Sequence, residues 1–272
     1  MLSACESTLE ALPIPAREAA RALPLPLQGG PWHAVRLGLD RIAGLSVGAA
    51  KRIVEARTHA AFIDTEDLTR RAALNAHELQ CLAQADALHA LTGHRHQAAW
   101  AVAGIDTRPT PMLRATRVSE DAVVLPAPAE ADETLADYRA LGLTLKRHPL
   151  ALLRDELARF RVQPAAVLRG YPNGRLARAS GLVTHRQRPE TAKGTMFITL
   201  EDDTGTVNAI VWPAVVESQR KPLLAARLLT LFGRWQRQEG EGDDAVMHLV
   251  VMKAIDHSDL LQGLVSRSRD FR

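Results

Sequence analysis

A basic stretch between residues 175 and 193 is the strongest candidate for chemistry in this chain. It holds five cations and one acid, Glu190, in a chain whose net charge is only +3. Arginine and lysine bind phosphate oxygens without reading bases, so such a stretch is typical of a surface that contacts a nucleic-acid backbone. The alternative is an ordinary solvated face. The cations are Arg175, Arg178, Arg186, Arg188 and Lys193.

Aromatic residues near this stretch could supply the other half of a single-strand site, because aromatic rings stack on bases of any sequence. The candidates are Phe197, Trp212 and Trp235, the last of which follows Arg234. Each could equally be a core residue, since aromatic side chains are the largest core formers. The sequence therefore predicts a nucleic-acid surface and leaves the role of each ring open.

Residues 42–50 fit most of the helix-hairpin-helix pattern, in which a glycine turn leads into a helix. In such a hairpin the backbone N–H groups at the start of the second helix hold a DNA phosphate without reading sequence. Gly44 fits the first glycine, and Ser46 replaces the second, where a serine can cap the following helix. Gly48 lies in the same turn, and Lys51 and Arg52 follow where a phosphate would sit. A plain helix pair with a glycine turn is the alternative.

A second hairpin at residues 82–88 has no glycine, and Asp86 would repel a phosphate, so we expect it to be structural. Its residues 84–88 resemble the short peptide that binds bacterial sliding clamps. Such a peptide must be exposed, whereas Leu82 and Leu88 are expected to pack inward. We therefore favour packing over a sliding-clamp partner.

No set of residues predicts catalysis. Two-metal phosphoryl transfer needs carboxylates that converge from separate strands, whereas Asp202 and Asp203 are adjacent and precede a glycine turn. His89, His94 and His96 lack the spacing of a metal site with cysteines or acids. No P-loop, GxSxG or HExxH motif occurs. We expect no catalytic residue, metal or cofactor in this chain.

The residues that could contact nucleic acid would be positioned by a β-barrel. After about residue 175 the chain alternates short β runs with turn signals. Five strands with a helix between the third and the fourth form an OB-fold, which binds single strands on its second and third strands and the loops beside them. The first strand contains Leu182-Val183, which lead into the segment 186–189, and the basic stretch falls on this strand and the loop after it. The other strands are predicted at 196–200, 207–212, 228–235 and 246–255, and the helix at 214–226.

The predicted fold class is therefore α+β, with a helical helix-hairpin-helix domain followed by a five-stranded OB-fold barrel. Helices are expected at 49–57, 64–73, 76–83 and 95–103, with Trp100 in the core. Later, Leu150, Leu153, Leu157 and Phe160 form one apolar stripe at helical spacing. We divide the chain into a Pro-rich segment 1–31, a helical domain 32–106, a linker 107–133, a helical connector 134–170 and the OB domain 171–272.

Composition excludes several other classes of protein. The 272 residues are 46% apolar and 24% charged, which is typical of a globular protein. Two cysteines, Cys5 and Cys81, do not form a disulfide framework. No apolar run approaches the length of a membrane span, and no signal-peptide pattern is present. We expect a cytoplasmic location and no membrane partner.

Several segments resemble the C-family of bacterial DNA polymerases, specifically the error-prone alpha-type subunit rather than the main replicative one. Residues 36–39, 44–45, Ala50 and Arg57 resemble the fingers-extension region, and the resemblance spans about residues 32–272. Its further segments are 137–138, 141–145, 148–150, the string RQRPETAKG at 186–194, FITLED at 197–202 and SRDF at 268–271.

The resemblance implies the C-terminal part of an enzyme that adds nucleotides to a primer in damage-induced, translesion repair synthesis. The family's catalytic carboxylates and their Mg²⁺ belong to a palm domain upstream of this part. We therefore expect a non-catalytic DNA-binding portion of a DNA polymerase. Its hairpin would bind duplex DNA and its barrel the single-stranded template, with a palm-bearing polymerase fragment or a Y-family-like protein as partner.

Two other interpretations stay open. One is a free-standing OB-fold module that binds nucleic acid such as RNA, although the helical block with its hairpin argues against it. The other is an inactive remnant of a truncated polymerase gene. A soluble, cooperative fold with affinity for DNA would argue against a remnant.

Overall fold

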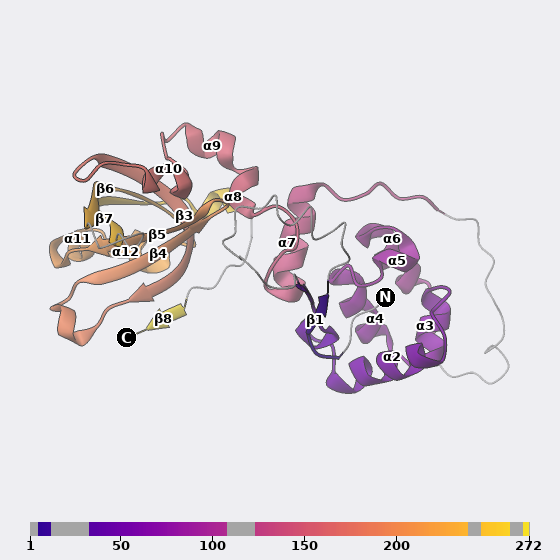
Figure 1. Cartoon of the computed structure of the whole chain (residues 1–272). Helices are drawn as coiled ribbons and strands as arrows, with labels where there is room; N and C mark the ends of the chain where they lie inside the picture. Colours follow the sequence, from indigo (N-terminus) through magenta and orange to yellow (C-terminus); the bar gives the residue numbers. More distant parts are fainter. Residues whose placement is uncertain (1–4, 12–32, 108–122, 239–245, 262–268, 272) are drawn as a thin grey trace. The chain divides into compact units, whose positions relative to one another are not determined.

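The computed structural model describes residues 5–11, 33–107, 123–238, 246–261 and 269–271 (Figure 1). The chain divides into two compact units, Met1–Leu141 and Gly142–Arg272, and each is described by itself. Among the described residues, no helix is long and apolar enough to cross a membrane.

The first unit is helical, with one small sheet. Strand β1 (Thr8–Ala11) pairs antiparallel with β2 (His33–Arg36), so part of the Pro-rich segment is a strand. The predicted helices are confirmed to within a few residues. The helices are the 3-10 helix η1 (Leu39–Arg41), α2 (Val47–His59), α3 (Thr65–Arg71), α4 (Ala76–Gln84), α5 (His89–Thr92), α6 (Arg95–Ala103) and α7 (Glu130–Leu141).

Polar side chains fix where these helices begin, because each accepts a hydrogen bond from an otherwise unpaired N–H of the first turn. The Oγ of Ser46 accepts from the Ala49 N–H, 3.0 Å away, as the sequence predicts. Asp64 caps α3 and His94 caps α6 in the same way. Asn75 begins α4 with a reciprocal capping box.

The core of the first unit lies between α2, α3, α4 and α6. Leu82 and Leu88 are fully buried in it, as expected from the sequence. The expectation for Trp100 was wrong, since 55% of its side chain is exposed. Helix α6 buries Ala98 and Val102. Trp100 is two positions from each of these residues and therefore lies on the opposite, exposed side of the helix.

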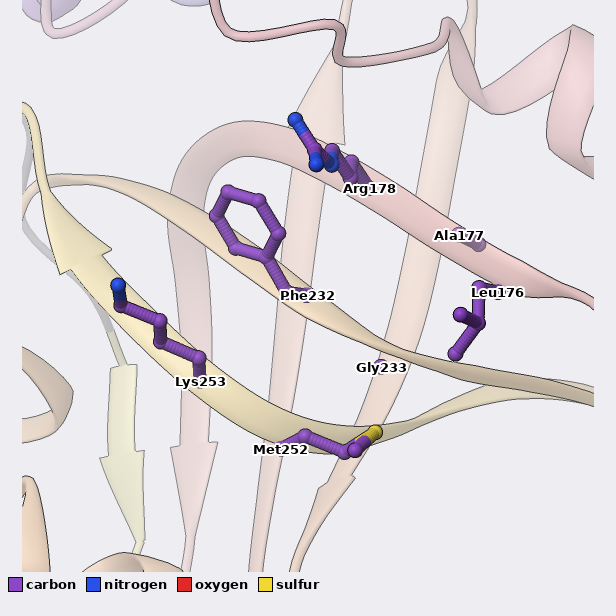
Figure 2. Close-up of a pocket in the computed structure, with 7 residues that line it drawn as sticks. All are labelled: Leu176, Ala177, Arg178, Phe232, Gly233, Met252 and Lys253. Atoms are coloured by element: carbon purple, nitrogen blue, oxygen red, sulfur yellow. The ribbon is translucent and has the colours of Figure 1, made fainter.

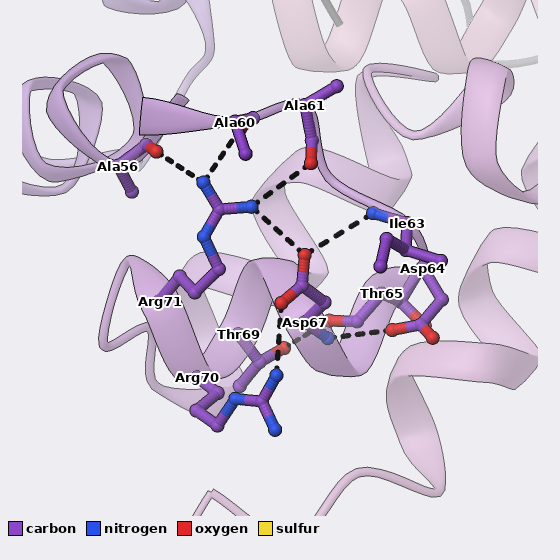
Figure 3. Close-up of polar contacts among 10 residues, drawn as sticks. All are labelled: Ala56, Ala60, Ala61, Ile63, Asp64, Thr65, Asp67, Thr69, Arg70 and Arg71. Carbon is purple, nitrogen blue, oxygen red and sulfur yellow. Dashed lines mark hydrogen bonds and ion pairs between the residues drawn. The ribbon is translucent and has the colours of Figure 1, made fainter. Parts of the chain in front are cut away.

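The end of α2 is held by α3 (Figure 3). The Arg71 guanidinium pairs with Asp67 at 3.0 Å and donates to one carbonyl in the last turn of α2 and to two carbonyls just after the helix. Burial alone would raise the pKa of the Asp67 carboxyl, but hydrogen bonds from Arg71, the Ile63 N–H and Arg70 lower it below its usual range. The carbonyls belong to Ala56, Ala60 and Ala61.

A buried arginine of α6 holds helix α7 against the rest of the first unit. Arg95 of α6 pairs with Glu133, 2.7 Å away, and with Asp137, and it donates to the Gln84 carbonyl at 3.0 Å. The boundary between the units therefore follows α7 and falls inside the segment 134–170, which the sequence predicts as a separate connector.

The second unit is a β-barrel preceded by short helices. Its sheet runs in the order β4-β5-β7-β6-β3-β8 and closes through a β3–β4 pairing. Its elements are α8 (Pro149–Leu152), α9 (Arg154–Ala158), α10 (Ala165–Arg169), β3 (Leu176–Gln187), η2 (Glu190–Ala192), β4 (Met196–Asp202), β5 (Gly205–Val211), α11 (Pro213–Ser218), α12 (Arg220–Ala225), β6 (Leu228–Gln238), β7 (Val246–Asp256), η3 (Ser258–Leu261) and β8 (Arg269–Phe271).

The barrel closes because β3 changes partners along its length. Its first half, from Leu176 to Leu182, pairs with β6, and its second half, from Leu182 to Gln187, pairs with β4. Two helices, α11 and α12, lie between the third and fourth strands, β5 and β6, which confirms the predicted OB-fold order. Strand β8 adds a short parallel pairing to β3 that the sequence did not predict.

The apolar stripe of the connector is broken in the structure. Helix α8 ends at Leu152, and α9 starts at Arg154. Leu150 and Leu157 are fully buried, whereas Phe160 lies beyond α9 and is 36% exposed. The predicted single stripe therefore holds only for its buried leucines.

Asp202 connects helices α9 and α10 to the barrel. It accepts hydrogen bonds from the Ala165 N–H at 2.8 Å and the Thr204 N–H at 2.7 Å, and it pairs with Arg154 at 2.9 Å. Burial alone would raise its pKa, but the Ala165 N–H, Thr204 and Arg154 together lower it. Asp203 also contacts Arg154. This carboxylate pair serves the turn and its packing, as the sequence predicts.

Candidate nucleic-acid interface

An open groove of about 420 Å³ lies on the outer face of β4 and β5. Phe197 and Ile210 form a cross-strand pair in its floor, and Trp212 follows β5 at one end. Phe197 is 37% exposed and Trp212 is 53% exposed, which is unusual for large aromatic side chains. The other lining residues are Thr191, Ala192, Lys193, Thr195 and Pro213.

The strand period explains why these rings point outward. Residues on β4 and β5 alternate between the barrel core and the surface. Thr199 and Asn208 share the outer face with Phe197, and the Thr199 Oγ1 donates to the Asn208 Oδ1 at 3.1 Å. The inward residues are Met196, Ile198, Leu200, Val207, Ala209 and Val211.

Two cations border this groove. Lys193 is exposed and has a left-handed backbone, with φ 47° and ψ 40°, which is uncommon for a residue with a side chain. Gly194 follows with φ 86°. A β-carbon added to Gly194 would lie 3.5 Å from the Arg188 Nη2 and 3.7 Å from the Cγ of Pro213, a groove residue. The structure thus brings Arg188 and Lys193 together with Phe197 and Trp212.

Arg186 does not share this environment. Its side chain is buried, and its guanidinium donates to the Leu223 carbonyl at 2.9 Å and to the Ala226 carbonyl. These carbonyls lie at the end of α12, where the backbone lacks helical partners. The expected phosphate contact from Arg186 therefore disagrees with the structure, and we remove this residue from the candidate site.

Trp235 is also unsuited to its expected role. It is only 2% exposed and belongs to the barrel core, so no face of its ring is open to a base. It points inward because it alternates on β6 with Arg234, which is exposed. We therefore remove Trp235 as a stacking platform.

The remaining cations of the basic stretch lie at the other end of β3. The Arg175 guanidinium stacks 4.0 Å from the Tyr171 ring centroid, and the Arg178 guanidinium lies 4.6 Å from that of Phe232. Arg234, opposite Leu176 on β6, donates to the Gly174 carbonyl at 2.8 Å. The sequence shows one basic stretch, whereas the structure separates it into groups at the two ends of β3.

The hairpin of the first unit has the expected turn. Gly44 has φ 80°, a left-handed conformation that favours glycine. Ser46 then begins α2, and among the described residues the N–H groups of Val47 and Gly48 have no partner. Lys51 is exposed one turn further along. The arrangement offers N–H donors and a cation to an anion.

Arg52, the second expected cation of the hairpin, is engaged inside the unit. It donates to the Ala72 carbonyl at 2.9 Å and pairs with Glu78 at 2.9 Å. Glu78 also accepts from the Ser46 Oγ and from the Asn75 N–H. Burial alone would raise the pKa of Glu78, but the Asn75 N–H, Arg52 and Ser46 lower it. Arg52 therefore joins the start of α2 to α4 and is not an open phosphate ligand.

Within the part of the chain that the structure describes, no three His, Cys, Asp or Glu side chains gather in a way that could hold a metal ion. Cys5 and Cys81 are both free thiols. Burial raises the pKa of the Cys81 thiol.

Comparison with known families agrees with both halves of this description. Residues 6–98 match the helix-hairpin-helix motif, and residues 177–254 match the OB-fold nucleic acid binding domain. Fold and site together define a protein that joins a helix-hairpin-helix region to a nucleic-acid-binding barrel.

Curated relatives identify the family. The chain is 46% identical over 271 residues to the error-prone DNA polymerase of Ralstonia nicotianae, covering 94% of this chain and 25% of that protein. It is 52% identical to that of an Azoarcus species and 48% identical to that of Aromatoleum aromaticum, covering 92% and 98% of this chain and 23% of each relative. The chain belongs to the error-prone DNA polymerase family and spans about a quarter of these relatives' length.

Two solved structures are similar to part of the chain. An asparaginyl-tRNA synthetase from Pyrococcus horikoshii is 24% identical with a TM-score of 0.25, covering 30% of this chain and 20% of its own. The SSB domain of a Synechococcus protein is 12% identical with a TM-score of 0.24, covering 31% of this chain and 96% of its own.

Proposed function

We propose that this chain is the DNA-binding, non-catalytic portion of an error-prone DNA polymerase that acts in damage-induced repair synthesis in the cytoplasm. The barrel binds the single-stranded template, and the hairpin holds the duplex by its backbone. Nucleotide addition and its Mg²⁺ are assigned to a palm domain outside these residues, and a Y-family-like protein is the expected partner. The names of the relatives support the polymerase assignment.

One observation carries the single-strand part of the proposal. Two exposed rings, Phe197 and Trp212, border a groove whose rim holds Lys193 and Arg188. Rings that stack on bases and cations that bind phosphates together form a site that takes single strands of any sequence. The second and third strands are also where OB-folds bind such ligands.

Changing the rings tests this site. Trp212→Ala and Phe197→Ala should each weaken binding of a labelled oligothymidylate by about 1–3 kcal/mol, measured by fluorescence anisotropy. Trp100→Ala is a matched control, because Trp100 is 55% exposed but lies in the first unit. Unchanged affinity in both groove variants would exclude stacking in this groove.

The salt dependence of binding tests the cations separately. Replacing Arg188 and Lys193 with Ala should reduce the slope of log affinity against log salt by roughly 1.4, since each phosphate contact contributes about 0.7 on a single strand. Lys221→Ala, on α12 outside the groove, should leave the slope unchanged. A slope that the double variant does not alter would contradict phosphate binding by this loop.

The RNA-binding alternative is tested with the same assay. A free-standing RNA module should prefer oligouridylate over oligothymidylate, since the 2′-hydroxyl is what distinguishes RNA. A template-binding domain should bind the DNA strand at least as well. A strong preference for RNA would favour the alternative.

A further inference from the structure

A second groove, of about 300 Å³, lies on the barrel where the start of β3 meets β6 and β7 (Figure 2). Its apolar residues are Leu176, Phe232 and Met252, and its cations are Arg178 and Lys253. It lies at the opposite end of the 12-residue strand β3 from the loop that holds Arg188 and Lys193.

The apolar side chains of this groove are unusually open to solvent. Leu176 is 66% exposed and Met252 is 60% exposed. Strands β6 and β7 shift register at Phe232 and Gly233, so that Phe232 pairs with Lys253 and Gly233 with Val251, and Met252 has no residue opposite it. The bulge therefore places Met252 on the outer surface of β7, across β6 and Gly233 from Leu176 (Figure 2).

Cations occupy the other end of the groove. In Figure 2 the side chains of Arg178 and Lys253 lie on opposite sides of the Phe232 ring. Lys253 is exposed and has no ion-pair partner among the described residues, and none of the residues that line the groove is acidic. The groove thus combines an aliphatic end with an unbalanced positive end.

We propose that this groove binds a short segment of a partner protein in which acidic residues adjoin a bulky apolar residue. The apolar side chain packs between Leu176 and Met252, and the carboxylates pair with Lys253 and Arg178. Complementary charge of this kind orients a partner, and burial of the apolar anchor provides affinity.

The same features disfavour a nucleic-acid strand here. Base stacking needs an open aromatic face, but the Arg178 guanidinium already covers the Phe232 ring at 4.6 Å. The remaining exposed side chains, Leu176 and Met252, are aliphatic and offer no ring. The groove of Phe197 and Trp212 instead has two exposed aromatic rings. The two surfaces therefore suit different partners.

The proposal is tested with the full chain and a fluorescein-labelled decapeptide that carries a Leu-Phe pair between acidic residues. Lys253→Glu and Met252→Asp should each weaken its binding by roughly five- to tenfold. Lys193→Glu, in the other groove, should not change it. A peptide with amides in place of the acids, or with Ser-Ser in place of Leu-Phe, should bind more weakly. Thermal melts that match the parent chain show that the variants are folded.

Three results would overturn the proposal. The first is no saturable peptide binding below about 1 mM. The second is peptide binding that neither Lys253→Glu nor Met252→Asp changes. The third is competition between oligothymidylate and the peptide together with loss of oligothymidylate affinity in Lys253→Glu, which would make this groove a nucleic-acid surface. Loss of oligothymidylate affinity only in the Phe197 and Trp212 variants leaves the two sites distinct.

Discussion

Lys51 and Arg52 are neighbours on α2, yet they have different surroundings. Arg52 donates to the Ala72 carbonyl and to Glu78, and these contacts hold α2 against the start of α4. Lys51 is exposed and has no such contact among the described residues. At the residue scale, binding and stability are therefore assigned to different side chains of the same helix turn.

We expect Lys51→Glu to weaken duplex binding equally for all sequences, because a phosphate contact carries no base information. Its melting temperature should stay close to that of the parent chain. Arg52→Ala should instead lower the free energy of unfolding by about 1–3 kcal/mol, since it leaves the buried Glu78 without its cation. Filter binding and thermal melts measure the two effects. Duplex affinity that is unchanged in Lys51→Glu would make the hairpin only a helix connector.

Trp235 gives a second prediction at this scale. Its ring fills the barrel core, but its indole N–H has no hydrogen-bond partner among the described residues. Trp235→Ala should cost about 3–5 kcal/mol of unfolding free energy, as large-to-small core changes do. Trp235→Phe should cost clearly less, because it also removes a buried, unpaired donor. If Trp235→Ala and Trp235→Phe lose the same free energy of unfolding in chemical denaturation, the indole N–H of the parent chain has a hydrogen-bond partner in solution.

The sequence indicated candidate cations and rings for the site but could not separate their surroundings. Arg186 and Arg188 are two positions apart with the same charge, and only the path of α12 shows that the first is buried against carbonyls. Phe197 and Trp235 both occur in apolar strands, and the inward or outward direction of each depends on register. Burial by distant elements is not visible in local sequence.

At the scale of elements, the order of strands was predictable because turn residues and the two-residue period mark each strand locally. The full length of β3 was not, since its first half is stabilised by pairing with β6, far along the chain. The break between α8 and α9 was also missed, because the apolar spacing of Leu150 and Leu157 continues across it.

The start of α8 makes the second unit sensitive to acid. His148 caps this helix, with its Nδ1 accepting from the Leu150 N–H at 3.2 Å. Burial lowers the pKa of the imidazole below its ordinary 6.5, although the carboxylates of Glu201, Asp203 and Asp202 partly oppose the shift. The folded state therefore disfavours the proton more than the unfolded state does, and stability present at neutral pH is lost as pH falls below about 6.5.

We expect the melting temperature of the second unit to fall between pH 7.5 and about pH 5.5, and His148→Asn to reduce that fall. Asparagine keeps a capping acceptor but does not titrate. Burial also lowers the pKa values of His248 and His257, so some pH dependence should remain in the variant. Calorimetry at several pH values measures this, and a full pH dependence in His148→Asn would assign it to other groups.

At the scale of the whole molecule, the chain consists of two units, each with its own core. The proline-rich residues near 109–128 suggested a boundary there, but α7 follows them and still belongs to the first unit through Arg95. The helix is distant in sequence from the core that it covers, which is why local composition misplaced the boundary. The candidate binding surfaces are divided in the same way, with the hairpin in one unit and both grooves in the other.

The last prediction separates the units at the boundary that the structure gives. Fragments 1–141 and 142–272 should each unfold cooperatively, and 142–272 should keep most of the oligothymidylate affinity of the full chain. Fragment 1–129 lacks α7 and leaves Arg95 without Glu133 and Asp137, which should cost about 3–5 kcal/mol relative to 1–141. Arg95→Met should then recover part of the stability of 1–129, because it removes the unpaired charge, while it destabilises 1–141. Circular dichroism melts of 1–129 and 1–141, each with and without Arg95→Met, measure these differences. Equal stability of 1–129 and 1–141 would show that α7 is not part of the first unit's cooperative core.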